Sequence, residues 1–307
     1  MNYDIIGDIH GQDGKLRVLL KELGYRIKDG AYRHPEGRTA LFLGDLIDRG
    51  PGQIEVINIV RNMMEAGSAR SIMGNHEWNA IGFATPDPEG KGYLRGRSVN
   101  RYKQHAEFLR QIGEDSALHK ETVDWFRTLP PFLDLGDIRL IHAWWNQKFV
   151  DQVAGSQEPN GRLSEEFVVG AFKRGSKSYA AMEGLTKGLE IDLPEGSSFL
   201  DHTGIERNVV RVQWWSDCSG TYRDVAMVPR SQMQRIPEIP LPMTLPGQVN
   251  GGAPIFIGHY WLSGTPSILA PNVACMDYSA GKEGPLVAYR WNGEPELSDS
   301  AFVVAGA

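Results

Sequence analysis

The sequence of 307 residues predicts an α/β fold in which short strands and helices alternate. In the first third, brief apolar runs alternate with stretches of helical periodicity, the pattern of βαβ units. Each apolar run ends in a cluster of Gly, Asp, His or Asn, residue types that favour turns. Hydrophobic residues make up 41% and charged residues 23%, ordinary values for a globular protein. We therefore expect one α/β domain over residues 1–307.

The first elements follow from apolar spacing. Tyr3–Ile6 and Thr39–Leu43 are expected strands, and Ala69–Met73 is a third. Lys15–Leu23 is an expected helix because leucines recur on one face, at Leu16, Leu19, Leu20 and Leu23. A second helix is indicated by Ile54, Ile57, Val60 and Met64. Another helix is expected to begin near Glu77.

The later elements are predicted by turn residues between apolar runs. Phe132–Leu135 and Ile138–Ile141 flank Gly136-Asp137 and predict a hairpin. Ile255–Ile257 and the run 273–291 are expected to return to the core as strands. From about Val150 to Gly252 the periodicity weakens, and we interpret the segments around 150–210 and 229–252 as insertions.

Composition limits the functional classes. A net charge of −6 argues against a general nucleic-acid surface, which would need a basic face. Only Cys218 and Cys275 occur, so we expect no disulfide framework and a reducing compartment, with the cytoplasm as the default. The N-terminus lacks the pattern of a signal peptide, and no apolar run approaches the ~18 residues of a membrane span. We expect no membrane partner, and the oligomeric state stays open.

Polar side chains gather in three loops, and each loop follows a predicted strand. The loops are Gly7–Gly11, Gly44–Gly50 and Gly74–Glu77. Because ligands bind beyond the carboxyl ends of strands in α/β sheets, we expect the loops to converge on one crevice. Their glycines allow sharp turns, and their carboxylates and imidazoles suit divalent metals.

The histidines fall into two groups. His10 and His76 lie in the loops, and His142 and His259 each follow an apolar strand, so we expect these four to be functional. The remaining histidines are expected to be ordinary surface or capping residues: His34, His105, His119 and His202.

The order and spacing of the three loops resemble the calcineurin-like metallophosphoesterases, and within them the phosphoprotein phosphatase branch. The resemblance implies a four-layer α/β/β/α sandwich with central mixed β-sheets. It also implies two divalent metal ions, with Mn as the first expectation and Fe, Zn or Ni as the alternatives. Its implied ligands are Asp8 and His10 for the first ion, Asp45 for both, and Asn75, His142 and His259 for the second.

The resemblance also implies catalytic roles. His76 would be the general acid, oriented by Asp48, and Arg49 would bind the substrate phosphate. Trp215-Ser216-Asp217 resembles a segment near the phosphate pocket of the same branch. Asp217 and Arg223 are therefore candidate substrate-binding residues. The alternatives are that Asp217 is a turn residue and that Arg223 is a solvated side chain.

These features predict a phosphoester hydrolase that uses a bridging hydroxide between two metals. The leading substrate is a phosphorylated protein side chain, although Trp144 and Trp145 stand where that branch carries small glycines. Ala274–Tyr278 resembles the bacterial diadenosine tetraphosphatases, so a dinucleoside polyphosphate is the alternative, while Asp48 and Glu77 depart from that group's pattern. A catalytically silent binding module is a third hypothesis, disfavoured by the intact ligand set.

Overall fold

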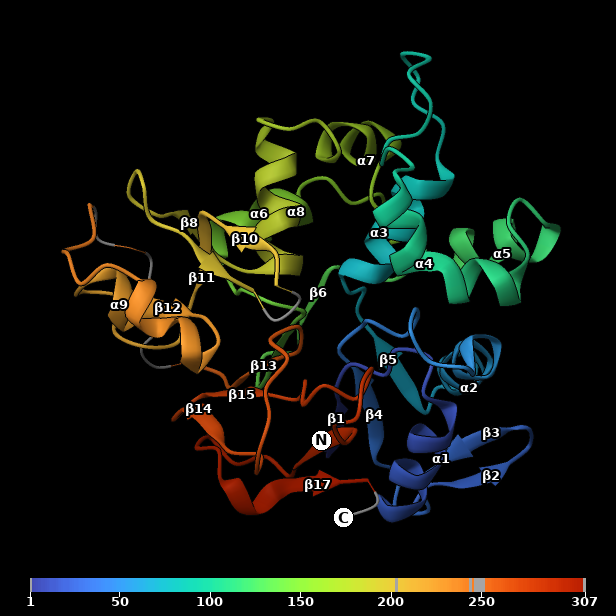
Figure 1. The fold of residues 1–307 in the computed structure, drawn as a ribbon. Helices are drawn as coiled ribbons and strands as arrows, with labels where there is room; N and C mark the ends of the chain where they lie inside the picture. Colours follow the sequence, from blue (N-terminus) through green and yellow to red (C-terminus); the bar gives the residue numbers. More distant parts are fainter. Residues whose placement is uncertain (1, 202–203, 243–244, 246–251, 306–307) are drawn as a thin grey trace. The chain divides into compact units, whose positions relative to one another are not determined.

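The computed structural model describes residues 2–201, 204–242, 245 and 252–305. The chain divides into two compact units, of which the first comprises Met1–Thr186 with Ala253–Ala307 and the second Lys187–Gly252 (Figure 1). The second unit overlaps the two segments that we interpreted as insertions. All three predicted loops, and the strands before them, belong to the first unit.

The first sheet of the large unit has the strand order β17-β16-β1-β4-β5. β1 (Tyr3–Ile6), β4 (Thr39–Phe42) and β5 (Ala69–Ser71) run parallel, with Tyr3 opposite Thr39 in register. β16 (Val287–Trp291) and β17 (Phe302–Val304) join as antiparallel strands. The parallel strands therefore end at one edge of the sheet and deliver the loops after them to the same place.

The second sheet has the order β14-β15-β13-β7-β6. β13 (Ile255–Ile257) lies parallel to both β15 (Val273–Cys275) and β7 (Arg139–Ile141). β6 (Phe132–Asp134) pairs with β7 in the predicted hairpin, and β14 (Ile268–Ala270) pairs with β15, both antiparallel. Both sheets are mixed, as predicted.

The core of the large unit lies between the two sheets. One apolar cluster contains Ile5 and Leu41 of the first sheet together with Leu140 and Phe256 of the second, all completely buried. The rings of Phe256 and Tyr289 bring the sheets into contact, with centroids 5.2 Å apart. Full burial of one such side chain stabilises the fold by about 1.5–3 kcal/mol. The predicted α/β class with central mixed sheets is confirmed.

Helices surround the sheets. Two follow the first strands, α1 (Asp13–Glu22) and α2 (Gln53–Glu65). The predicted apolar face of α1 is confirmed, because its leucines are buried. For α2 the prediction was partly wrong: Val56, Ile59 and Met63 are buried, whereas Ile54 and Met64 are only half-buried. The apolar residues of α2 are so dense that spacing alone does not fix the buried face.

The other helices were less visible in the sequence. α3 (Asn75–Ala84) begins two residues before the predicted start, directly after Gly74. The remaining helices of the large unit are α4 (Val99–Ile112), α5 (Ala117–Phe126), α6 (Gln147–Ala154), α7 (Glu165–Ala171), α8 (Lys177–Lys187, whose last residue belongs to the second unit) and the 3₁₀ turn η2 (Asp299–Ala301). A short hairpin of β2 (Arg26–Lys28) and β3 (Ala31–Arg33) follows α1.

The second unit has a sheet and a core of its own. β11 (Val209–Val212) pairs antiparallel with β8 (Glu190–Asp192) and β12 (Ala226–Met227). Its other elements are β9 (Phe199–Leu200), β10 (Glu206–Arg207), α9 (Tyr222–Val225) and η1 (Arg230–Arg235). An apolar cluster in this unit consists of Leu193, Phe199, Val210, Tyr222, Ala226 and Ile236.

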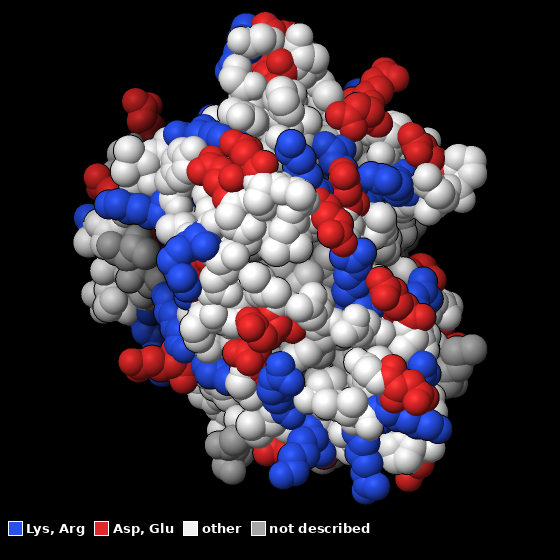
Figure 2. Space-filling view, turned by 90° about the vertical axis from the view of Figure 1, so that its right-hand side faces the viewer, with Lys and Arg blue, Asp and Glu red and all other residues white. Residues whose placement is uncertain are grey.

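Charged side chains are distributed over the surface with both signs interspersed on the face shown in Figure 2. In the described ranges, no helix combines the length and apolar character that crossing a bilayer requires. The two cysteines, Cys218 and Cys275, are both free and buried.

Candidate metal centre

The loops after five strands bring the predicted ligands together within the large unit. Asp8, Asp45 and Asn75 follow the parallel strands β1, β4 and β5. His142 and His259 follow β7 and β13, which are parallel strands of the second sheet. The carboxyl ends of both sheets thus contribute to one site, in accordance with the rule for α/β sheets.

Asp45 lies at the centre of this site. Its Oδ2 is 3.7 Å from His10 Nε2 and 3.8 Å from His76 Nε2. Its Oδ1 is 3.3 Å from His142 Nε2. The two carboxylate oxygens therefore face two different groups of potential ligands, one with His10 and His76 and the other with His142 and His259.

Two further side chains complete the cluster. Asn75 Oδ1 lies 3.2 Å from His142 Nε2. Asp8 accepts a hydrogen bond of 3.0 Å from the backbone N–H of His259 through Oδ2. All six predicted metal ligands are buried, none more than 9% exposed. The structure thus brings together the full predicted ligand set.

The donor atoms of this cluster fit divalent cations. Among the described residues, Asp8 Oδ1 and His10 Nε2 are buried without a hydrogen-bond partner. Burying such atoms unpaired is unfavourable unless a cation or water contacts them. The other ring nitrogens of two histidines donate to backbone carbonyls, His10 Nδ1 to Ile47 at 3.0 Å and His142 Nδ1 to Leu43 at 2.7 Å. This directs both Nε2 atoms into the cluster, the arrangement found in metal-binding histidines.

The electrostatics of the cluster also favour a bound cation. Burial raises the pKa of Asp8 well above its ordinary value, and the neighbouring Asp277 and Asp45 raise it further. Burial lowers the pKa of His142, but Asp45 and Asp8 outweigh it and raise this pKa to about 10. Burial, together with His76, lowers the pKa of His10 to about 3, so this imidazole stays neutral and able to coordinate a metal.

The backbone at the site is strained. Several non-glycine residues adopt positive φ: His10, Asp45, Asp48, Arg49, His259 and Trp261, at 49–74°. Each such residue costs on the order of 1–3 kcal/mol and persists only where the surroundings hold it. Two glycines provide the space that the acids need. A Cβ at Gly74 would lie 2.2 Å from Asp45 Oδ1, and one at Gly258 would lie 2.1 Å from Asp8 Oδ1.

Beside the ligands, Asp48 joins two histidines. Its Oδ2 contacts His76 Nδ1, and its Oδ1 lies 2.6 Å from His105 Nδ1. Burial raises the pKa of Asp48, but His105 and His76 outweigh it and hold this pKa well below the usual range. Burial lowers the pKa of His76, yet Asp45 and Asp48 raise it overall. The pair suits a protonated His76, which could donate to a leaving group.

The expectation for His105 was wrong. We predicted an ordinary surface or capping residue, but the side chain is 5% exposed and hydrogen-bonded to Asp48. Its position with Phe108, Leu109 and Ile112 on the buried face of α4 was a signal in the sequence. His119 is also buried, and it accepts from the N–H of Asp115 as a local cap.

His34 is half-buried and bonds to the carbonyl of Leu23, a structural contact. The fourth histidine of that group, His202, lies outside the described residues.

Glu77 is a structural residue of the site that the sequence did not reveal. Its buried carboxylate accepts three backbone N–H groups: Asp45 at 2.9 Å, Leu46 at 2.8 Å and Gly74 at 2.8 Å. Glu77 therefore connects the second loop to the third and fixes the position of Asp45.

Arg49 lies at the surface of the cluster. Its side chain is exposed, and Cζ lies 3.7 Å from the ring centroid of Trp261. The guanidinium is next to the metal ligands and open to a substrate, so its phosphate-binding role remains a prediction with suitable geometry.

Asp217 and Arg223 belong to the second unit. Asp217 accepts from the N–H of Ser219 at 3.0 Å. Arg223 donates to the carbonyl of Ile236 at 2.8 Å and to Glu238 at 2.5 Å. These contacts are local, and the substrate-binding role of both residues stays a prediction.

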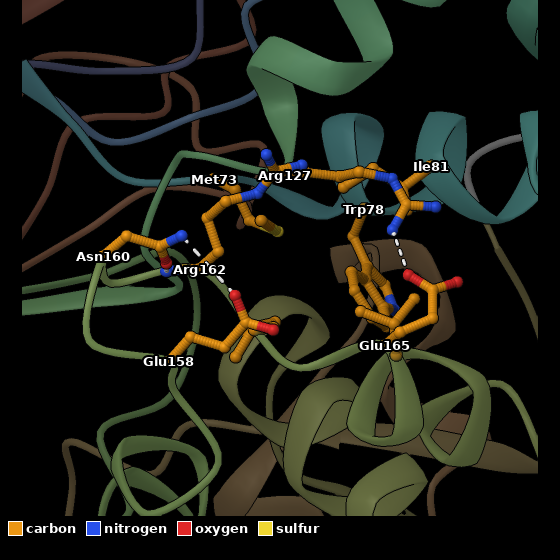
Figure 3. Close-up of a pocket in the computed structure, with 10 residues that line it drawn as sticks. Met73, Trp78, Ile81, Arg127, Glu158, Asn160, Arg162 and Glu165 are labelled. Carbon is orange, nitrogen blue, oxygen red and sulfur yellow. Dashed lines mark hydrogen bonds and ion pairs between the residues drawn. The ribbon is translucent and has the colours of Figure 1, made fainter.

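A separate pocket of about 150 Å³ contains none of the predicted site residues (Figure 3). Trp78 and Ile81 of α3 line it together with Arg127 and Arg162. Arg127 forms an ion pair with Glu165 at 2.9 Å that crosses its rim. The ring of Trp78 is stacked on that of Phe172, with centroids 4.6 Å apart.

Known proteins similar to this chain include two bacterial relatives. A bis(5'-nucleosyl)-tetraphosphatase PrpE of the asymmetrical type, from Halalkalibacterium halodurans, is 49% identical over 174 residues, 55% of this chain and 65% of that protein. A protein of the same name from Oceanobacillus iheyensis is 47% identical over 143 residues, 47% of this chain and 55% of that protein. The chain thus spans less than two thirds of the length of these relatives.

Among solved structures, a serine/threonine protein phosphatase from Saccharomyces cerevisiae has a TM-score of 0.51 at 16% identity. The match covers 99% of this chain and 78% of that chain, and it shows a common fold. Residues 1–168, which contain all the predicted ligands except His259, match the calcineurin-like phosphoesterases. The chain belongs to the calcineurin-like phosphoesterase family.

Proposed function

We propose that this protein is a metal-dependent hydrolase that cleaves a phosphoanhydride bond in dinucleoside polyphosphates. The observation that carries the hydrolase is the buried cluster around Asp45, whose two oxygens face two groups of ligands. The substrate class is supported by the relatives at 49% and 47% identity, which are named bis(5'-nucleosyl)-tetraphosphatases.

The ligand set supports two divalent ions, of which we propose Mn²⁺ first. When bound, such ions act as Lewis acids on a phosphoryl oxygen and lower the pKa of water to near neutrality. Asp8 and His10 would hold one ion and Asn75, His142 and His259 the other, with Asp45 contacting both.

The chain's own residues perform the remaining steps. Arg49 binds the phosphoryl group under attack, because a guanidinium matches phosphate oxygens bidentately. His76 donates a proton to the departing oxygen, and Asp48 keeps its ring oriented through Nδ1. A departing nucleotide phosphate is less basic than an alkoxide. His76 should therefore matter less for a phosphoanhydride than for an alkyl phosphate.

A phosphorylated protein side chain, our first expectation, is now the second candidate. The yeast phosphatase shares the fold, but 16% identity does not extend to its substrate. Trp144 and Trp145, which stand where that branch carries small glycines, are only 5% and 2% exposed, so both indoles pack in the core.

One panel of substrates tests the proposal. Purified protein with Mn²⁺ is offered diadenosine tetraphosphate, phosphopeptides and p-nitrophenyl phosphate, with Asp45→Asn as the inactive control. We expect the highest kcat/KM on the tetraphosphate, with ATP and AMP as products of an asymmetrical cut. Two molecules of ADP would show a symmetrical cut. Higher kcat/KM on phosphopeptides would reverse the order of the two candidates.

A further inference from the structure

We propose that Lys282 and the groove beside it form a subsite for the part of the substrate beyond the phosphoryl group under attack. Lys282 would bind a second phosphoryl group, and the groove would receive the nucleoside attached to it. The inference rests on the proposed function, because it assigns a binding site to one end of a dinucleoside polyphosphate.

The segment that carries Lys282 lies directly against the metal centre. A Cβ at Gly281 would come within 2.7 Å of His10 Cδ2 and 2.8 Å of Arg49 Cδ. Only glycine allows this approach, so the neighbouring Lys282 stands at the entrance to the site. Both Lys282 and Arg49 are exposed.

Trp261 connects the two cations. Arg49 Cζ lies 3.7 Å from the centroid of its ring, and Lys282 Nζ lies 4.6 Å from it. The backbone N–H of Trp261 donates to Asp277 at 2.7 Å, which fixes the residue in its left-handed conformation. Across the described ranges, no carboxylate lies within ion-pairing distance of either cation. Two like charges held near one ring and unpaired favour an anion with more than one phosphate.

The Lys282 segment is held rigidly. Lys15 of α1 donates through Nζ to the carbonyls of Ala280 and Gly284, both at 2.8 Å, and to that of Lys282 at 3.2 Å. Ser279 Oγ donates to the carbonyl of Leu262 at 3.0 Å. Because the backbone of this segment is already fixed, it need not be ordered when a ligand binds, which reduces the entropy lost on binding.

Lys282 also borders a groove of about 520 Å³. Leu262, Tyr278 and Pro285 contribute apolar surface, and Ser263 lies on its exposed wall. Ligand sites combine an apolar lining with a few polar groups, and this volume is in their usual range of about 300–1,000 Å³. An occupant that is anionic at one end and has a flat apolar ring at the other matches Lys282 and the groove. A nucleoside with its phosphates has this chemistry.

The test uses competition, so that it does not depend on turnover of the tetraphosphate. Hydrolysis of p-nitrophenyl phosphate at saturating free Mn²⁺ is inhibited with inorganic tripolyphosphate or with ATP. In Lys282→Met, we expect both inhibition constants to rise about tenfold, since a charge-assisted contact to phosphate is lost. The kcat/KM for p-nitrophenyl phosphate is measured in parallel, and a rise of both inhibition constants that exceeds any loss of kcat/KM separates a contact to the second phosphoryl group from a general effect on the site.

Three variants serve as controls. Lys282→Arg retains the charge and should restore inhibition. Lys21→Met removes an exposed lysine of α1 and should change neither constant. Ser263→Phe fills the groove and should weaken inhibition by ATP but not by tripolyphosphate.

Unchanged inhibition in Lys282→Met, or an equal effect of Lys21→Met, would overturn the phosphate role. Equal effects of Ser263→Phe on both inhibitors, or on neither, would overturn the nucleoside role. If the tetraphosphate were not hydrolysed at all while these shifts appeared, the proposed function would fail and the subsite would stand.

Discussion

Replacing Glu77 with glutamine should loosen the loop that carries Asp45. The carboxylate accepts N–H groups of Asp45 and Gly74 on Oε2 and of Leu46 on Oε1. A glutamine can place its carbonyl oxygen where Oε2 accepts the N–H groups of Asp45 and Gly74. Its NH₂ then faces the N–H of Leu46. One buried donor loses its acceptor, and the other two bonds lose the negative charge.

The magnitude follows from these three bonds. A hydrogen bond to a charged group contributes about 1.5–3 kcal/mol, and a buried donor left unpaired costs about 1–3 kcal/mol. We expect Glu77→Gln to destabilise this region by about 2–4 kcal/mol. Exchange of the Leu46 amide hydrogen should then accelerate by roughly 30- to 1,000-fold if it proceeds through local opening.

Hydrogen exchange followed by mass spectrometry over residues 40–50 measures this effect, with urea unfolding as an independent measure of stability. Glu166→Gln is the matched control, since Glu166 is exposed on α7. Both measurements are made with the cations removed by EDTA and again with Mn²⁺. A change below about 0.5 kcal/mol in Glu77→Gln, with unchanged exchange at Leu46, would refute the role of this side chain.

The other predictions concern the cluster itself. Asp45→Asn should abolish turnover and reduce the metal content measured by mass spectrometry, and two retained ions with full activity would contradict its central place. Arg49→Ala should lower kcat/KM about 10- to 100-fold with metal content intact, whereas loss of metal would show that its role is misassigned. His76→Asn should keep the metals and lose about 10²–10⁴-fold on alkyl phosphates but much less on p-nitrophenyl phosphate. His105→Gln should show the same selectivity to a smaller degree, and equal losses on both substrates would indicate a purely structural role.

The sequence was most informative where backbone direction alone determines the position of a side chain. Asp8, Asp45 and Asn75 follow parallel strands, so strand prediction was enough to place them at one edge. His142 and His259 required the additional step that two sheets pack face to face, which came from the family resemblance. Periodicity does not reveal how sheets stack, since each strand buries apolar residues whichever partner it meets.

The residues that support the site were much less predictable. Glu77 looked only like a departure from a known pattern, because its role depends on three N–H groups that converge after folding. His105 lies on α4, remote in sequence from Asp48, and only tertiary packing joins them. In the sequence Lys282 is one of many charged residues. Only the close approach of Gly281 to His10 and Arg49 in the folded chain distinguishes it. Long-range contacts of polar groups leave no periodic signal in a single sequence.

The same long-range contacts explain how the chain tolerates an unfavourable site. Asp8, Asp45 and Asp277 are each only 1% exposed, and their mutual repulsion would favour opening the cluster. Strained residues such as His10 and His259 oppose the native backbone as well. Hydrogen bonds donated by backbone N–H groups oppose the opening. Glu77 accepts from Gly74, Asp277 accepts from Trp261 and Ser279, and Asp8 accepts from His259. Divalent cations would remove the repulsion, so their binding free energy would add directly to the stability of the large unit. The second unit contains none of these acids, and its stability should therefore respond little to removal of the cations.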